Sequence, residues 1–139
     1  MRLRMELFVD DLDISIAFYT GALGFEVTRR SDDYVSLRRG SVVLGLGPVA
    51  KLPEDGAGPG FTRHRLAACR GAGVEIVLEL DHLSQVTALH DRCRDLGLVV
   101  EALQLRPWGL HDFRVSDPDG YYLRITDGNA AAPAPGLPG

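Results

Sequence analysis

The chain has 139 residues, which is enough for one hydrophobic core, so a single domain is expected. Its 45% hydrophobic and 24% charged content is that of a globular protein and excludes a disordered chain. The net charge of −4 argues against sequence-independent binding to nucleic acid, and no apolar run approaches the roughly 20 residues that cross a bilayer.

The first half of the chain predicts the element order βαβββ. Alternating apolar residues up to Val9 predict a strand, and apolar residues at helical spacing then predict a helix. Gly24 stands where the C-terminus of this helix needs a residue in the left-handed conformation. Asp11 or Asp13 is expected to cap the N-terminus of this helix. Three strands follow at 25–30, 34–38 and 41–46, with Arg39-Gly40 as a turn. The residues expected in the core are Leu3, Met5, Leu7 and Val9 of the first strand and Ile14, Ala17, Phe18 and Leu23 of the helix.

The second half repeats this order, because residues 76–100 parallel residues 5–27. A strand is predicted near 74–80, and a helix capped by Asp81 or Ser84 ends at Gly97. Strands are predicted at 98–105, 111–116 and 121–126, with the turn Asp117-Pro118-Asp119-Gly120 between the last two. The residues expected in the core are Val74, Ile76, Leu78 and Leu80 of the strand, Val86, Leu89, Cys93 and Leu96 of the helix, and Tyr121, Leu123 and Ile125 of the last strand.

The chain is therefore expected to divide into module one at 1–46, a linker at 47–73 and module two at 74–127, all within one domain. The Gly- and Pro-rich stretch 47–60 indicates a loop, and residues 128–139 are expected to form a disordered tail. The two cysteines, Cys69 and Cys93, have no CxxC spacing, which favours buried thiols in a cytoplasmic protein rather than a disulfide or a zinc site.

Two segments carry a resemblance to a known family. "VDDLDISIAFYTGALGFEV" near the start and "PWGLHDFRVSDPDGYYLRI" near the end resemble the vicinal oxygen chelate superfamily of glyoxalases, dioxygenases and bleomycin-resistance proteins, over about 1–46 and 74–127. The resemblance implies an α+β fold in which two tandem βαβββ modules form cupped mixed sheets around a ligand. It also implies a homodimer in which the chains exchange arms. The superfamily includes isomerases, dioxygenases, thiol transferases and non-catalytic drug binders, so the fold alone does not decide the activity.

Strand alternation predicts which side chains point into the cups. The inward residues are expected to be Arg4, Glu6 and Phe8, then Val42, Leu44 and Leu46, then Glu75, Val77 and Glu79, and finally Tyr122, Arg124 and Thr126. Metal-using relatives place ligands at positions that correspond here to Arg4, Leu44, Glu75 and Arg124. Of these only Glu75 can bind a metal ion, because a guanidinium has no lone pair and leucine has no donor atom. We therefore expect neither metal nor cofactor, and an ion-pair network among Arg4, Glu75 and Arg124 instead.

Aromatic residues are candidates for a flat, apolar wall of the pocket. They are Phe8, Tyr34, Phe61, Trp108, Phe113 and Tyr122. The Pro-Trp-Gly sequence around Trp108 resembles the rim of the drug groove in bleomycin-resistance proteins, and His111 follows it closely. Stacking against such rings suits a planar polycyclic ligand. The full expected set of ligand-binding residues is Arg4, Glu6, Phe8, Tyr34, Leu44, Glu75, Val77, Glu79, Trp108, His111, Phe113, Tyr122 and Arg124.

The sequence thus favours a metal-free binding protein that sequesters a bulky, partly aromatic antibiotic or natural product and confers resistance. The alternative is a metal-independent isomerase or cyclase of natural-product metabolism, in which Glu75 or Glu79 acts as the base. A metal-dependent glyoxalase or dioxygenase is a poorer third interpretation.

Overall fold

The computed structural model describes residues 1–68 and 70–128. The described residues form two compact units, one within 1–73 together with 117–121 and the other made of 74–116 with 122–128. Cys69 and nearly all of the expected disordered tail lie outside the described residues.

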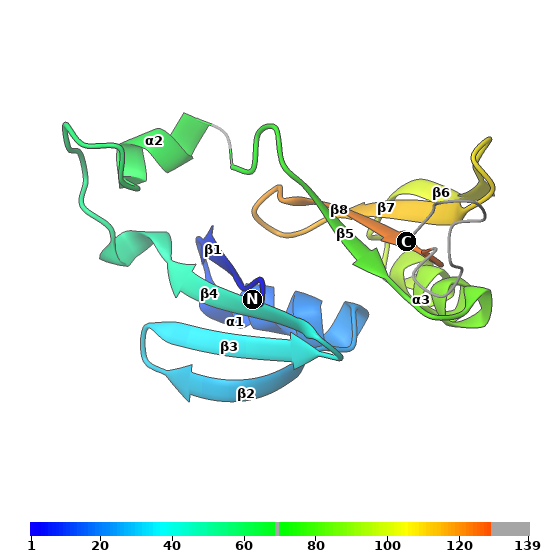
Figure 1. The fold of residues 1–139 in the computed structure, drawn as a ribbon. Coiled ribbons are helices and arrows are strands. Elements are labelled where there is room, and N and C mark those ends of the chain that lie inside the picture. The colour runs from blue at the N-terminus through cyan, green and yellow to red at the C-terminus, as the bar shows by residue number, and fades with distance from the viewer. Residues whose placement is uncertain (69, 129–139) are drawn as a thin grey trace. The chain divides into compact units, whose positions relative to one another are not determined.

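The first unit contains a four-stranded mixed sheet. Its strands lie in the order β1-β4-β3-β2, with β1 parallel to β4 and the other neighbours antiparallel (Figure 1). The elements are β1 (Met5–Val9), α1 (Leu12–Ala17), the π-helix η1 (Phe18–Ala22), β2 (Glu26–Ser31), β3 (Tyr34–Arg39), β4 (Val42–Pro48), the 3-10 helix η2 (Val49–Lys51) and α2 (Arg63–Ala68).

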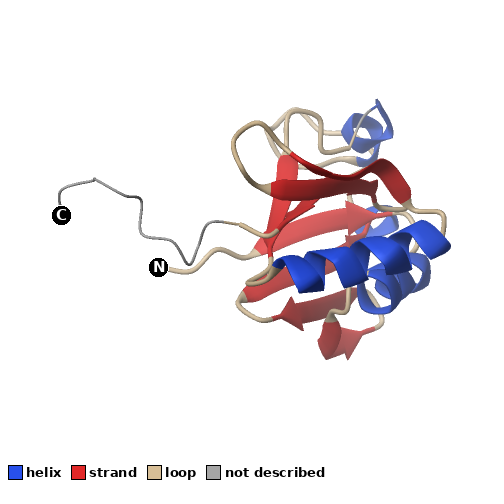
Figure 2. Cartoon of the chain, turned by 90° about the vertical axis from the view of Figure 1, so that its right-hand side faces the viewer, coloured by secondary structure: helices blue, strands red, loops and turns tan. Residues whose placement is uncertain are grey.

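The second unit repeats the same sheet. Its strands lie in the order β5-β8-β7-β6, with β5 parallel to β8, and helix α3 packs against β6, β7 and β8 (Figure 2). The elements are β5 (Glu75–Glu79), α3 (Leu83–Asp95), β6 (Val99–Leu105), β7 (His111–Ser116) and β8 (Tyr122–Thr126). The predicted α+β class and the duplicated βαβββ modules are confirmed. No helix among the described residues is long and apolar enough to cross a membrane.

The predicted ends of both long helical segments are largely correct. The side chain of Asp11 caps α1 by accepting a hydrogen bond from the backbone N–H of Ile14, at 3.1 Å. Gly24 and Gly97 have φ angles of 73° and 72°, the left-handed conformation that glycine adopts at little cost. The cap of α3 was predicted at Asp81 or Ser84 and is instead His82, whose backbone N–H donates to the side chain of Gln85 at 3.0 Å.

The buried face of the first helix differs from the prediction. Ile14 is 56% exposed and Ala17 is also exposed, whereas Tyr19 is completely buried. The buried residues are Ser15, Phe18, Tyr19, Ala22 and Leu23. This stripe keeps helical spacing but is shifted along the chain, because the Tyr19 hydroxyl has a buried partner that a purely apolar pattern does not reveal.

Three further core predictions are wrong at the ends of elements. Leu3, Val74 and Leu96 are 80%, 50% and 56% exposed. Strands β1 and β5 begin only at Met5 and Glu75. The alternating apolar pattern in the sequence begins before the first residue of each strand, so it predicted strands that were too long. Leu96 follows the last residue of α3, where the helix no longer covers the sheet.

The predicted linker is more ordered than its composition indicates. Strand β4 continues to Pro48, and η2 and α2 lie within 47–73. The Thr62 hydroxyl accepts a hydrogen bond from the backbone N–H of Arg65 at 3.2 Å, and the Arg65 guanidinium donates to the carbonyl of Gly56 at 3.0 Å. These side-chain contacts organise a segment that has little apolar surface to bury.

A buried carboxylate fixes the turn 117–121 in the first unit. Asp117 accepts hydrogen bonds from the Tyr19 hydroxyl at 2.8 Å and from the backbone N–H groups of Asp119 and Tyr121, both at 2.9 Å. The Tyr121 hydroxyl donates to the carbonyl of Phe8 at 2.9 Å. Asp119 pairs with Arg70 and accepts from the backbone N–H of Asp10 at 2.8 Å. Burial raises the pKa of Asp117 above its ordinary value, against the effect of these hydrogen bonds.

The hydrogen bonds of Asp117 predict a large loss of stability for one substitution of this residue and a small change for another. Asp117→Ala leaves three buried donors without an acceptor and should lower the free energy of unfolding by roughly 2–4 kcal/mol. Asp117→Asn keeps an acceptor for the two N–H groups and removes a buried charge, so it should change stability by less than about 1 kcal/mol. A carboxyl group whose pKa is raised by folding stabilises the protein below the pKa that it has in the unfolded chain, and this contribution is lost as the pH rises through the raised pKa. Any gain in stability from the Asn variant should therefore appear near neutral pH. Urea unfolding at pH 7 measures the free energy of unfolding of both variants. Equal losses of stability in the two would contradict the role of Asp117 as a buried acceptor.

Candidate functional site

Each sheet has one face against its helix and an opposite face, called here the open face. In the first unit the open face carries Glu6 and Phe8 on β1 and Gly45 and Gly47 on β4. A side chain at Gly45 would overlap the Glu6 carboxylate, and one at Gly47 would touch the Phe8 ring. The two glycines therefore let these β1 side chains lie across the neighbouring strand.

The predicted inward positions of Leu44 and Leu46 are wrong. Leu44 is paired with Met5 and Leu46 with Leu7, and both leucines are completely buried in the core. Residues opposite one another in neighbouring strands share a face, so Gly45 rather than Leu44 occupies the open-face position. The prediction failed because β4 has no polar residue, and its glycines have no side chain to show which face of the strand points inward.

Glu6 organises the polar part of this face. It accepts a hydrogen bond from the Nε of Arg4 at 2.7 Å and another from the Tyr34 hydroxyl at 3.1 Å. The Arg4 guanidinium lies 5.6 Å from the centre of the Tyr34 ring. Arg4, which was expected to join Glu75 and Arg124, thus has its ion pair with Glu6. Both side chains are about half exposed, so this pair contributes little stability.

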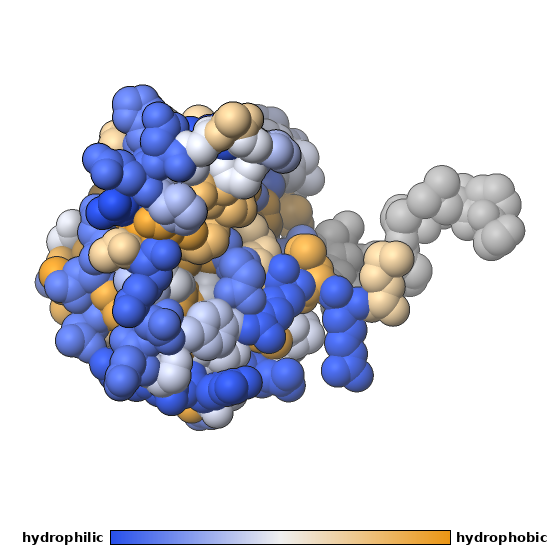
Figure 3. Space-filling view, turned by 90° about the vertical axis from the view of Figure 1, so that its left-hand side faces the viewer, coloured by the Kyte–Doolittle hydropathy of each residue, from blue (hydrophilic) through white to orange (hydrophobic). Residues whose placement is uncertain are grey.

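Two aromatic rings meet on the same unit. The rings of Phe8 and Phe61 lie 4.6 Å apart between centres and are tilted by 45°, an arrangement favourable for aromatic pairs. Phe61 is 59% exposed. On the face drawn in Figure 3, hydrophobic residues are interspersed among hydrophilic ones.

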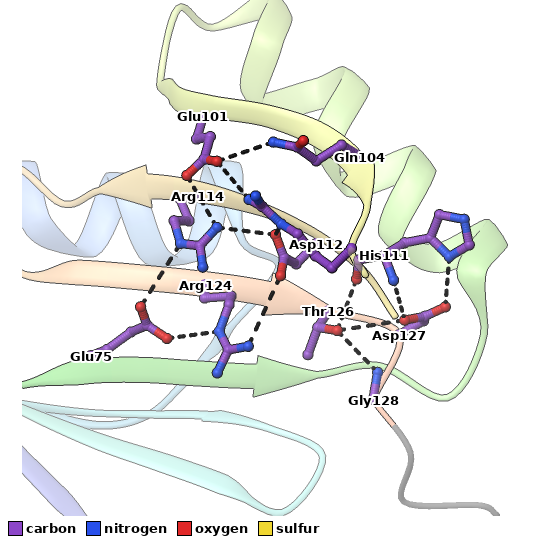
Figure 4. A network of polar contacts seen from close by, with 11 residues as sticks. Glu75, Glu101, Gln104, His111, Asp112, Arg114, Arg124, Thr126, Asp127 and Gly128 are labelled. Carbon is purple, nitrogen blue, oxygen red and sulfur yellow. Dashed lines mark hydrogen bonds and ion pairs between the residues drawn. The ribbon is translucent and has the colours of Figure 1, made fainter. Parts of the chain in front are cut away.

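The open face of the second unit carries a dense ion-pair network (Figure 4). The Nε of Arg124 donates to Glu75 at 2.7 Å, so the predicted Glu75–Arg124 pair is present. Arg114, on the adjacent strand β7 opposite Arg124, lies 3.8 Å from the other Glu75 oxygen. It also donates to Glu101 and to Asp112, at 3.1 Å in each case.

Asp112 is the buried centre of this network. Its side chain is completely buried, and its Oδ1 accepts from Arg106 at 2.7 Å and from Arg114 at 3.1 Å. Its Oδ2 is buried and has no hydrogen-bond partner among the described residues. Arg124 Nη1 lies 4.0 Å from that oxygen. A buried acceptor without a donor costs about 1–3 kcal/mol.

Glu101 of β6 forms the solvent side of the network. It accepts from Arg106 at 2.7 Å, from Arg114 at 3.1 Å and from Gln104 at 3.0 Å. The hydrogen bond from Arg106 is the main reason why the pKa of Glu101 lies below its ordinary value of 4.5. Sequence reasoning missed Glu101, Arg106, Asp112 and Arg114. The alternation of Asp112 and Arg114 with Phe113 and Val115 along β7 was the signal that could have found two of them.

Phe113 does not line the open face, contrary to the prediction. It is completely buried and its ring meets His90 edge-on, with 5.2 Å between the ring centres. It therefore belongs to the core beneath α3. Val77 and Tyr122 do lie on the open face with Glu75 and Arg124, Val77 being 38% exposed. Glu79 lies on the same face of β5 and is exposed.

His111 has a carboxylate partner. Its Nδ1 lies 3.1 Å from Asp127, and the other oxygen of that carboxylate accepts from the His111 backbone N–H at 3.0 Å. Asp127 therefore fixes the orientation of the imidazole at the end of β7.

Trp108 lies in a short loop whose ends are held together. The backbone N–H of Arg106 donates to the carbonyl of Leu110 at 2.8 Å, and that of Gly109 donates to the carbonyl of Arg106 at 2.9 Å. Gly109 has a φ angle of 90°, which a residue with a side chain rarely adopts. The Arg106 side chain anchors this loop to Glu101 and Asp112. Trp108 itself is 59% exposed, so it is a surface residue of an anchored loop.

A family model described as the Glyoxalase/Bleomycin resistance protein/Dioxygenase superfamily matches residues 3–125. The chain belongs to this superfamily. No curated protein matches the chain.

Several solved structures of this superfamily's fold resemble the chain. A lactoylglutathione lyase from Agrobacterium tumefaciens is 24% identical over 92% of this chain and 93% of its own, with a TM-score of 0.70. A bleomycin resistance determinant encoded on transposon Tn5 is 23% identical over 93% and 98%, with a TM-score of 0.64. TioX from Micromonospora sp. ML1 is 20% identical over 91% and 97%, with a TM-score of 0.70. These similarities establish the fold and leave the activity within the superfamily open.

The open faces of this superfamily member do not suit a divalent metal ion. The corrected ligand positions hold Arg4, Gly45, Glu75 and Arg124, of which only Glu75 has a ligating atom, and that carboxylate is engaged by arginines. Within residues 1–68 and 70–128, no three His, Cys, Asp or Glu side chains group as a metal site would require. The thiol of Cys93 is buried, and burial raises its pKa to about 11, which disfavours the thiolate that metals bind.

Calorimetric titration with nickel, manganese, zinc and iron(II) should therefore detect no stoichiometric binding that EDTA reverses. Glu75→Ala is the matched control, since it removes the one possible ligand. Tight binding to the wild-type chain that disappears in Glu75→Ala would contradict this prediction.

Acid should weaken the ion-pair network through Glu101. A carboxyl group whose pKa is lowered by folding contributes stability above its ordinary value, here 4.5, and loses that contribution as the pH falls through the lowered value. Glu101→Gln should therefore flatten the fall of the melting temperature below about pH 4.5. Melting curves from pH 7 to 3 test this, with Asp95→Asn, at an exposed ion pair of α3, as control. Parallel profiles for wild type and Glu101→Gln would show that Glu101 makes no such contribution.

Proposed function

We propose that this protein is a metal-free binding protein that sequesters a bulky, partly aromatic antibiotic or natural product in the cytoplasm and so confers resistance. The observation that carries the proposal is Trp108, a large aromatic side chain held at the surface on an anchored loop. Exposing an indole costs hydrophobic stabilisation that a ligand stacked on it recovers. An anchored platform loses little conformational entropy on binding, which favours high affinity.

The ion-pair network supports binding rather than catalysis. Glu75 would be the base of an isomerase or cyclase, but it accepts from Arg124 and lies close to Arg114. A carboxylate held in this way must break an ion pair before it takes a proton from a substrate. The network contains three arginines (Arg106, Arg114 and Arg124) and three carboxylates (Glu75, Glu101 and Asp112), so its formal charge is zero. Such a surface is preformed and does not require an ionic ligand.

Glu79 keeps the enzymatic alternative open. It lies on the open face of β5 two residues after Glu75, is exposed, and has no ion pair within the described part of the chain. A metal-independent isomerase or cyclase would use this carboxylate as its base.

The proposal includes a homodimer, in which the second chain or the ligand would cover exposed apolar side chains such as Phe61, which packs on Phe8, and Val77, on the open face of β5. Light scattering at micromolar concentration should give close to twice the chain mass of 15.1 kDa. A mass of one chain at all concentrations would rule out the dimer.

Trp108→Ala tests the proposed function. Loss of a stacked aromatic residue at a binding hot spot costs more than about 2 kcal/mol, so the affinity for a planar ligand should fall by roughly thirtyfold or more. Because Trp108 is exposed, the melting temperature should hardly change. Ligands are found first through quenching of the single tryptophan of the wild-type chain, and calorimetry then compares the variants.

Leu105→Ala is the matched control, because Leu105 is equally exposed, at 61%, on the strand that leads into the loop. It should bind the ligand as the wild type does. Normal affinity in Trp108→Ala, or a large fall in its melting temperature, would contradict the role given to Trp108.

A further inference from the structure

The network on the second sheet contains an acceptor and donors that the protein itself leaves unused. The Oδ2 atom of Asp112 is buried and has no hydrogen-bond partner among the described residues, although Oδ1 of the same carboxylate has two. Arg124 has its one hydrogen bond in the described structure through Nε, to Glu75, so its terminal nitrogens have N–H groups to donate. Buried polar atoms are ordinarily hydrogen-bonded, so an oxygen that has only a 4.0 Å ion-pair contact with Arg124 and no hydrogen bond in the described part of the chain points to a ligand.

The spacing of these atoms selects the shape of the ligand group. Asp112 Oδ2 and Arg124 Nη1 lie 4.0 Å apart, which is too far for a hydrogen bond between them. In an amide whose N–H and C=O point to the same side, the nitrogen and oxygen are about 2.2 Å apart, as standard bond lengths require. Two hydrogen bonds of about 2.9 Å that diverge slightly from the amide therefore join its closely spaced nitrogen and oxygen to the more widely spaced protein atoms. The N–H then donates to Asp112 and the C=O accepts from Arg124.

The charges exclude the simpler ligands. A carboxylate would accept from Arg124 but be repelled by Asp112, and an ammonium group would meet Asp112 but be repelled by Arg124. The network is already neutral, so either ion would leave a net charge in a partly buried site. A neutral group with adjacent donor and acceptor avoids both penalties.

A ligand would approach this position beside Arg124, whose side chain must shift because Asp112 Oδ2 is itself shielded from solvent. The Arg124 and Glu75 side chains are 25% and 34% exposed, whereas Asp112 is completely buried behind them. Such a shift is open to the Arg124 side chain because no hydrogen bond in the described structure holds its terminal nitrogens in place.

We infer that the second sheet binds a neutral, planar ligand through a lactam, imide or primary amide edge, with its N–H on Asp112 and its C=O on Arg124. This inference rests on the proposed sequestering function and names the chemical group that the site selects.

The test compares three bicyclic probes of similar size: 2-quinolinone, which carries a lactam edge, its N-methyl derivative, which lacks the donor, and quinoline-2-carboxylate. Titration of the full chain should give a dissociation constant at least tenfold lower for 2-quinolinone than for either other probe. A site built to pair with an N–H rejects the analogue that lacks it. Equal binding of the lactam and its N-methyl derivative, or no binding of the lactam at millimolar concentration, would overturn the inference.

Asp112→Asn gives a sharper result, because it exchanges an acceptor for a donor. Arg106 and Arg114 retain the oxygen of the new amide, so its NH2 group takes the place of Oδ2. The preference should reverse, with quinoline-2-carboxylate binding more tightly than 2-quinolinone. Arg124→Gln, at a more exposed position, should weaken 2-quinolinone about tenfold even if Asp112→Asn fails to fold. The control Asp95→Asn should match the wild type. Unchanged affinity in Arg124→Gln would contradict the inference.

Failure of this inference is distinguishable from failure of the proposed function. If the N-methyl probe binds as well as the lactam and Trp108→Ala abolishes both, sequestration stands and the amide-edge contact is wrong. If Trp108→Ala has no effect on any planar ligand that the wild type binds, the proposed function itself fails.

Discussion

The buried carboxylate of Asp112 holds the guanidinium groups of Arg106 and Arg114 on the open face of the second sheet. Arg106 in turn anchors the loop that carries Trp108, and Arg114 links the strands that carry Glu101 and Glu75. A buried charge is tolerated only when it is paired, so these contacts depend on one another. Asp112 thus helps to position the loop that carries the exposed indole, and its charge balances part of the positive charge of the site.

The two modules share a fold but differ in what their open faces offer. On the first, Gly45 and Gly47 allow Glu6 and Phe8 to lie flat, and Phe8 packs against Phe61. On the second, arginines and carboxylates fill the equivalent surface. One βαβββ frame can present either surface, because the core face fixes the fold and the opposite residues are free to vary. Among superfamily members this freedom accommodates both enzymes and binding proteins.

The fold could be predicted because its signals are local: alternation, Asp11 as a cap, and the glycines at 24 and 97. The site was predicted only in part. Glu75 with Arg124 followed from alternation, whereas Leu44 was misplaced because β4 is uniformly apolar, and Phe113 because its core partner His90 lies on a distant helix. Asp112 escaped prediction because polar residues are assumed to be exposed, and only the three-dimensional pairing with Arg106 and Arg114 explains its burial.

Sequestration, as proposed, requires that the protein hold its ligand without changing it. The most direct measurement incubates the chain in D2O with a planar ligand that quenches Trp108, then recovers the ligand for mass spectrometry and proton NMR. Sequestration predicts a ligand of unchanged mass and structure at carbon, with no deuterium there beyond a protein-free control. A new isomer, a cyclised product, or deuterium at a carbon that the control leaves untouched would show proton abstraction by a base such as Glu79 and would contradict sequestration.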